Sequence, residues 1–148
     1  MPKQRGEHEE PTIGFLLKQL NDSMKQVVDT ELQPFGLTMT QGQFLYFLRT
    51  RMGKKTSPRD FEEHFGIAHP TVVGVLKRLE QKDLITSTSD PDDGRRKIIA
   101  LAPAEKQIHH QALATRRTID ARLVEGFTAS EVSDLKIMLK RLLANIQG

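Results

Sequence analysis

Residues 56–101 read TSPRDFEEHFGIAHPTVVGVLKRLEQKDLITSTSDPDDGRRKIIAL, and the rest of the chain is organised around them. Within this stretch, residues 69–82 repeat apolar side chains at steps of three and four, which predicts a helix with one buried face. The repeating residues are Val72, Val75, Leu76 and Leu79. Pro70 suits the first helical position, where its missing N–H is not needed, so His69 is expected to be the N-cap residue.

A shorter helix is predicted just before it. Ser57 is a good N-cap residue, Pro58 fits the first helical position, and Asp60 favours the positive end of the helix dipole. Gly66 is expected to end this helix. The turn over residues 66–69 then has the length found between the two helices of a helix-turn-helix.

The exposed row of the second helix carries no acidic residue. This row consists of Pro70, Val73, Gly74, Lys77 and Gln81, with Arg78 beside it. Its first side chains are small, and small side chains let a helix backbone approach the edges of DNA bases, while Lys77 or Arg78 can reach a phosphate. Val73 can meet a thymine methyl group, although a partly exposed valine also needs no functional explanation.

A β-hairpin is predicted after the second helix. Two β-prone runs, residues 83–88 and 95–101, flank a turn rich in Asp, Pro and Gly. The basic cluster Arg95-Arg96-Lys97 follows the turn directly. A hairpin beside a helix-turn-helix makes a winged helix, which places a basic loop next to a helix that can enter a DNA groove.

The run PTVVGVLKRLEQKDLI (residues 70–85), followed by DPDDGRRKIIALAPAEK (residues 90–106), resembles the MarR family of winged-helix transcriptional regulators. The resemblance covers nearly the whole chain, and the wing motif is its most specific part. It implies an obligate homodimer, usually a repressor, whose recognition helix enters the major groove and whose wing arginine enters the minor groove. It also implies release by a small anionic or aromatic effector, bound between the dimerisation helices and the winged helix; no motif marks the residues of that pocket.

The resemblance assigns roles to individual residues. Arg95 stands at the position of the minor-groove arginine, Arg96 can share that role because Gly94 replaces a further arginine, and Asp93 is expected to brace the arginine by a charge-assisted hydrogen bond. Thr71 lies where the family often places a Ser or Thr near DNA. Gly74 departs from the family, in which a long polar side chain is common there. The predicted DNA-binding residues are Ser57, Pro58, His69, Pro70, Thr71, Val73, Gly74, Lys77, Arg78, Arg95 and Arg96.

Apolar helical patterns at both ends of the chain predict dimerisation. Neither terminal helix has enough partners within one copy to cover its apolar face, so two copies are expected to interdigitate around a two-fold axis. We predict a mobile tail over residues 1–11, a dimerisation region over residues 12–36 and 103–148, and a winged-helix region over residues 37–102. The predicted dimerisation residues are Ile13, Leu16, Leu17, Leu20, Leu135, Leu139, Leu142, Leu143 and Ile146.

Composition excludes several other classes of protein. The 148 residues contain no cysteine, so a disulfide or thiol switch is impossible, and they contain no nucleotide-binding loop, serine-hydrolase motif or paired-histidine metal motif. We therefore predict no enzyme activity, no cofactor and no metal. His109 and His110 are adjacent on a helix, so they cannot share a metal from one face and are expected to be exposed. The absence of a signal peptide and of a long apolar segment predicts a cytoplasmic protein without membrane contact.

The predicted fold class is mainly α with a small β-hairpin wing. The predicted partners are double-stranded DNA with a palindromic operator, a second copy of the chain, and a small aromatic or anionic effector. A net charge of +3 permits DNA binding but equally suits simple solubility. Two alternatives stay open: a winged helix that binds another protein, and a DNA binder with no effector. Likewise, the basic residues of 49–55 can touch phosphate or form a solvated helix end.

Overall fold

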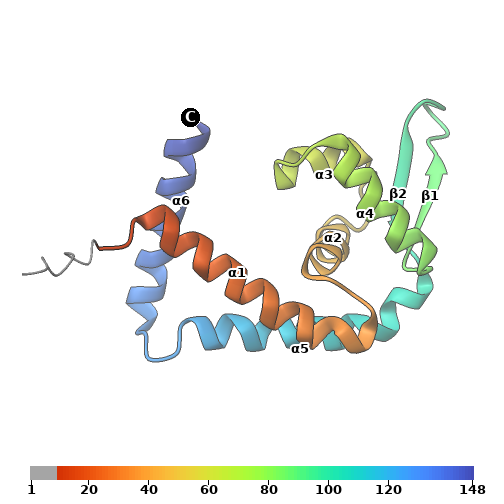
Figure 1. Ribbon diagram of the computed structural model, residues 1–148. Helices are drawn as coiled ribbons and strands as arrows, with labels where there is room; N and C mark the ends of the chain where they lie inside the picture. Colours follow the sequence, from red (N-terminus) through yellow and green to blue (C-terminus); the bar gives the residue numbers. More distant parts are fainter. Residues whose placement is uncertain (1–9) are drawn as a thin grey trace, which may run out of the picture.

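The computed structural model describes residues 10–148, so most of the predicted tail, residues 1–9, lies outside the described part of the chain. The fold class is confirmed: the described residues form helices and one antiparallel hairpin (Figure 1). The elements are α1 Ile13–Leu32, η1 Gln33–Phe35, α2 Met39–Thr50, α3 Pro58–Phe65, α4 His69–Gln81, β1 Ile85–Ser89, β2 Lys97–Leu101, η2 Pro103–Glu105, α5 Lys106–Leu123 and α6 Ala129–Gln147.

Short polar side chains set the beginnings of most helices. Ser57 and Asp60 form a reciprocal capping box at α3, which confirms the predicted start of that helix. Thr128 and Glu131 form a second capping box at α6. The predicted cap of α4 is wrong by one residue. Ala68 is the N-cap and His69 is already helical, because the chain turns into the helix at Ala68 without any side-chain cap bond.

An aromatic cluster joins the helix-turn-helix to α2. Phe44 of α2 is fully buried, with its ring centroid 4.7 Å from that of Phe61 and 4.9 Å from that of Phe65, both on α3. Phe47 lies 5.0 Å from Phe61 on the other side. Stacked and edge-on aromatic pairs add to the burial of their large apolar surfaces. The core is completed from α4 by Val72, Leu76 and Leu79.

The hairpin is pinned to the helical body at its second strand. β1 and β2 pair with Ile85 opposite Leu101 and Ser89 opposite Lys97. The N–H of Ile99 donates to the carbonyl of Thr56 at 2.8 Å, so the segment before α3 forms an additional backbone contact along β2. Ile99 is buried, whereas its neighbours Ile98 and Ala100 are partly buried and exposed, respectively. The hairpin therefore projects from the helical body at a fixed position beside α4.

The first and last helices of the chain lie to one side of the winged helix. In Figure 1, α1 and α5 run side by side, and α6 stands at the end opposite to α4 and the hairpin. No residue of α6 is buried, although the helix is rich in leucine. Seven of the nine predicted dimerisation residues are exposed, and only Leu135 and Leu142 are partly covered. The predicted set lacks four further exposed apolar residues of this region: Phe15, Phe127, Ile137 and Met138.

No helix within residues 10–148 combines the length and apolar character that spanning a membrane requires.

Candidate nucleic-acid interface

Helix α4 divides into a buried face and an exposed face, as its periodicity predicts. Val72, Leu76 and Leu79 are buried, and Val75 is partly buried. The exposed face carries the residues that the sequence analysis selected, namely Pro70, Thr71, Val73, Gly74, Lys77 and Arg78. Val73 is 43% exposed and belongs to this face. The face is thus free to contact a partner.

An open groove of about 1020 Å³ separates α4 from the hairpin. It brings together seven of the predicted DNA-binding residues with the predicted bracing residue. These are Ser57, Pro58, His69, Val73, Lys77, Arg95, Arg96 and Asp93. The other four (Pro70, Thr71, Gly74 and Arg78) do not line the groove and lie on the exposed surface of α4. Ser57 itself is buried, and its hydroxyl donates to Asp60, so it serves the start of α3.

The groove is less uniformly basic than the exposed row of α4. Glu62, Glu63 and Glu80 line it as well, and they were missed because they come from other helix faces or another helix. Nδ1 of His69 lies 3.1 Å from a carboxylate oxygen of Glu62, so this contact joins the first residue of α4 to α3. A polyanion can therefore approach the row of α4 and the wing tip more readily than the floor of the groove.

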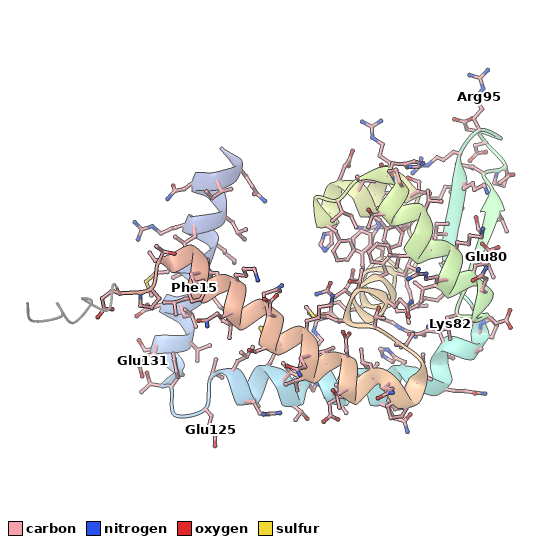
Figure 2. The ribbon with its side chains drawn as sticks, viewed as in Figure 1. Phe15, Glu80, Lys82, Arg95, Glu125 and Glu131 are labelled. Carbon is pink, nitrogen blue, oxygen red and sulfur yellow. The ribbon has the colours of Figure 1, made fainter. Side chains whose placement is uncertain are left out.

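The wing arginine stands clear of the body. Figure 2 places Arg95 at the outer end of the hairpin, pointing away from the helices. Asp93 accepts a hydrogen bond from the backbone N–H of Arg95 at 3.1 Å, so it shapes the turn. The carboxylate of Asp93 was predicted to bond the guanidinium group of Arg95, but it bonds the backbone N–H of that residue instead. The bond leaves the Arg95 side chain available to a partner.

A lysine from outside the hairpin clamps the start of the loop that joins β1 to β2. Nζ of Lys55 lies 2.8 Å from Oδ1 of Asp90 and 2.5 Å from Oδ2 of Asp92. The Asp90 side chain is 4% exposed, and it also accepts the N–H of Asp92 at 3.0 Å. The hydrogen bond from Lys55 is the main cause that lowers the pKa of Asp90, and the same bond raises the pKa of Lys55. The sequence analysis missed this clamp, which spans 35 residues.

A second ionic cluster lies where α3 meets β2. Asp60 accepts hydrogen bonds from the N–H and hydroxyl of Ser57, and the guanidinium groups of Arg51 and Arg96 approach it at 3.7 and 3.8 Å. Partial burial raises the pKa of Asp60, but the bonds from Ser57 and the two arginines outweigh it, so the pKa is lowered overall. Arg96 is therefore tied to the body, whereas Arg95 is not.

Replacing Lys55 with methionine should loosen the wing. Asp90 would lose its cation while staying buried, so amide exchange at Arg96 and Ile99 should accelerate, as measured by NMR. Because the folded-state pKa of Asp90 lies below its ordinary value of 3.8, the clamp contributes above that value and is lost as the pH falls through the lower folded value. Lys54→Met, one residue earlier, is the control. Equal exchange rates in both variants at neutral pH would contradict a clamp.

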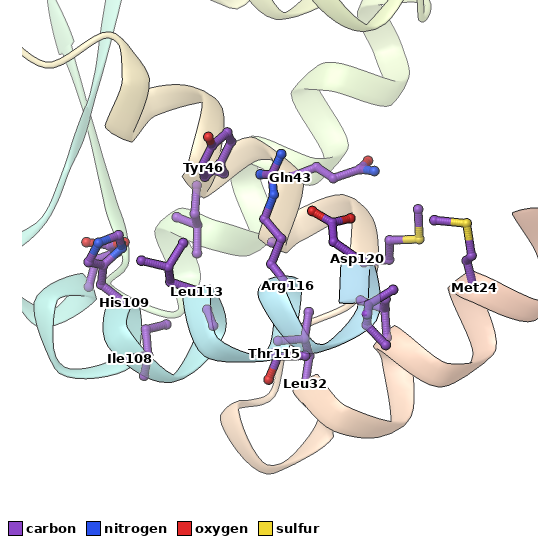
Figure 3. A pocket seen from close by; sticks show the side chains of 17 residues that line it. Met24, Leu32, Gln43, Tyr46, Ile108, His109, Leu113, Thr115, Arg116 and Asp120 are labelled. Atoms are coloured by element: carbon purple, nitrogen blue, oxygen red, sulfur yellow. The ribbon is translucent and has the colours of Figure 1, made fainter. Parts of the chain in front are cut away.

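A separate cavity of about 240 Å³ lies between α1, α2 and α5 (Figure 3). Its walls are mainly apolar and include Met24, Val28 and Leu32 from α1. The guanidinium carbon of Arg116 sits 3.5 Å from the ring centroid of Tyr46, a cation–π arrangement at the wall. An apolar cavity with a few polar groups is a usual site for a small ligand. No local pattern predicts this cavity, because its residues come from three helices.

One end of the cavity is closed by a buried ion pair. Arg49 of α2 donates to Glu105, which is almost fully buried at the start of α5, and Nε of Arg49 has no hydrogen-bond partner in the described structure. His109 lies 3.7 Å from Glu105 with its side chain only 25% exposed, so the expectation that it is exposed is wrong. Residues 10–148 contain no cluster of three or more His, Asp or Glu side chains suited to a metal ion.

Three of the basic residues of 49–55 form ion pairs with acids of other elements. Arg49 pairs with Glu105, Arg51 with Asp60, and Lys55 with Asp90. A purely solvated helix end therefore does not describe these three residues. They join α2 and the loop after it to α5, α3 and the hairpin.

Comparison with known proteins places this architecture in a family. The family model described as MarR family matches residues 35–96, which span α2 to the wing. The Staphylococcus aureus MepR–DNA complex is 27% identical with a TM-score of 0.88, and the match covers 92% of this chain and 99% of that one. The transcription regulator MarR from Oenococcus oeni PSU-1 is 26% identical with a TM-score of 0.76, over 90% and 99% of the two chains.

A probable transcriptional regulator from Pseudomonas aeruginosa is 30% identical with a TM-score of 0.77, over 88% of this chain and 96% of that one. The likeness therefore extends beyond the winged helix to α1, α5 and α6, which the family model leaves unmatched. The predicted family is confirmed: this chain belongs to the MarR family of transcription regulators.

Proposed function

We propose that the protein is a homodimeric, sequence-specific DNA-binding regulator that represses genes from a palindromic operator and is released by a small aromatic or anionic effector. One observation carries the proposal: α4 exposes an acid-free row directly beside a wing whose tip arginine is unpaired with any acid among residues 10–148. A helix fits the major groove, and an arginine on an adjoining loop fits the narrow minor groove. The relative MepR was crystallised with DNA, which supports the same use of the fold here.

The exposed face favours DNA over a protein partner. A surface that binds protein would present an apolar patch, whereas α4 offers one exposed valine flanked by small or basic residues. Lys77 and Arg78 follow Val73 and Gly74 on this face and are placed to reach phosphate. Phosphate contacts of this kind make binding fall steeply with salt concentration.

The exposed apolar residues of α1 and α6 support the dimer. They form a surface that a single copy leaves in water, which is rare for a monomer of this size. We assign residues 12–36 and 103–148 to dimerisation and residues 37–102 to DNA binding. A two-fold dimer presents two recognition helices about one turn of DNA apart, and such a pair reads an inverted repeat.

Replacing Arg95 with alanine should weaken operator binding by about 1–3 kcal/mol if the side chain enters the groove. The operator is first selected from random duplex DNA with the wild-type protein, and affinities are then measured by mobility-shift titration. Lys106→Ala removes the same charge from the first turn of α5, away from the wing, and should leave the affinity nearly unchanged. Equal affinities for wild type and Arg95→Ala would remove Arg95 from the interface.

We place the effector in the cavity between α1, α2 and α5. Because α1 and α5 belong to the proposed dimerisation region and α2 carries the helix-turn-helix, an effector there touches both parts of the molecule. A ligand that binds better to a dimer with wrongly spaced recognition helices shifts the population towards it. The stacked guanidinium group of Arg116 and the apolar wall suit an aromatic carboxylate.

Arg116→Gln should weaken the binding of benzoate-type effectors about tenfold, which corresponds to the loss of one charge-assisted hydrogen bond. Isothermal titration with a panel of aromatic acids measures this directly. Arg117→Gln removes the same charge from the next residue, which does not line the cavity, and serves as the control. A panel that neither binds nor changes operator affinity would leave a DNA binder without an effector.

A further inference from the structure

Gly74 occupies the middle of α4 although nothing inside the chain requires a glycine there. The position is helical, and a Cβ atom built on it would meet no other atom within 4 Å. Three other glycines have a reason within the fold: Gly36 and Gly66 adopt left-handed backbone conformations, and a Cβ atom built on Gly42 would lie 3.1 Å from a methyl carbon of Leu32. Glycine in a helix interior destabilises the fold relative to alanine. We therefore expect the glycine to serve a contact with another molecule.

The neighbours of Gly74 form a notch on the exposed side of α4. Side chains three and four residues apart lie next to each other on a helix, so Pro70 and Thr71 border the position on one side and Lys77 and Arg78 border it on the other. Val73 stands beside it and is 43% exposed. All of these side chains are exposed. The notch thus has the bare helix backbone as its floor, Pro70, Thr71 and Val73 at its walls, and two cations at its far rim.

We propose that Gly74 determines sequence specificity by admitting the methyl group of a thymine into this notch. The thymine methyl is the apolar group that projects from base pairs into the major groove, and apolar side chains recognise it by contact. A Cβ atom at residue 74 would fill the space that the methyl needs. The flanking Lys77 and Arg78 can hold the helix at that depth through the phosphates. This inference rests on the proposed DNA-binding function and adds the chemical group that the helix reads.

The test compares operators that carry thymine or uracil, since uracil lacks only the methyl group. The wild-type protein should lose about threefold to tenfold in affinity when one thymine of each half-site is replaced by uracil. Gly74→Ala should bind the thymine operator about tenfold more weakly and bind the uracil operator about as well as wild type does. Its thermal midpoint should rise by about 2–4 °C, which excludes misfolding as the cause.

Three other results would overturn the inference. If Gly74→Ala keeps wild-type affinity and the same preference for thymine over uracil, the notch does not receive the methyl. If it weakens binding to both operators equally, Gly74 affects docking without reading a base. If the wild-type protein selects no duplex at all, the proposed function fails first; this result is distinguishable, because the other two require a wild-type protein that binds.

Discussion

Replacing Leu143 with arginine is expected to turn the protein into a monomer and to weaken operator binding by more than about a hundredfold. Leu143 is 57% exposed on α6, so the substitution leaves the packing within one copy intact. In a two-fold dimer it would bury two unpaired charges, and each such charge costs several kcal/mol. A monomer also loses the second half-site, because only a pair of recognition helices spans the inverted repeat.

Sedimentation equilibrium measures the oligomeric state, and mobility-shift titration measures the operator affinity. Ser133→Arg places the same charge on the same helix, at an exposed position away from the row of Leu135, Leu139 and Leu142. This control should remain dimeric. A dimer of unchanged strength in Leu143→Arg would show that α6 is not the dimerisation surface, and operator binding by a stable monomer would refute the need for two copies.

Replacing Glu105 with glutamine should lower the free energy of unfolding by about 3 kcal/mol. The Glu105 side chain is 4% exposed and that of Arg49 is 22% exposed, so the variant leaves a largely desolvated guanidinium group without its counter-charge. Nε of Arg49 already lacks a hydrogen-bond partner in the described structure, and Glu105 is the only acid that pairs with Arg49 among residues 10–148. Urea denaturation followed by circular dichroism gives the value.

The double variant Arg49→Met, Glu105→Leu is the matched comparison. An apolar pair of similar volume removes both desolvation penalties at once, so its stability should return to near that of wild type. If Glu105→Gln is as stable as wild type, the pair contributes nothing to the attachment of α5 to α2. If the double variant is as unstable as the single one, the loss comes from packing and has no electrostatic origin.

Local sequence signals predicted the helices and their ends well. Thr128 with Glu131, and Ser57 with Asp60, are short-range patterns in which one residue satisfies the backbone of another three positions away. The N-cap of α4 was predicted at His69, one residue too late. The actual N-cap, Ala68, has no side-chain acceptor that a sequence pattern could reveal. The exposed and buried faces of α4 followed from a spacing of 3.6 residues, which needs no tertiary information.

The ionic contacts and the cavity could not be predicted in this way. Lys55 meets Asp90 across 35 residues, and Arg49 meets Glu105 across 56. Neither spacing carries a pattern, because such pairs form only after the helices have packed. The same holds for Arg116 and Tyr46, which face each other from α5 and α2. The roles of Arg95 and Arg96 looked similar in sequence, and only the fold separates a side chain held by Asp60 from one that is not.

The ion pairs around the wing also neutralise positive charge that would otherwise attract distant anions. Three of the four cations in residues 49–55 have their charge offset by acids of the same chain, and Arg96 faces Asp60. The cations near the wing that have no acid partner among residues 10–148 include Lys77, Arg78 and Arg95. In the proposed function, the positive charge that attracts any duplex therefore sits on the same surface that reads the operator, so attraction and base reading act together.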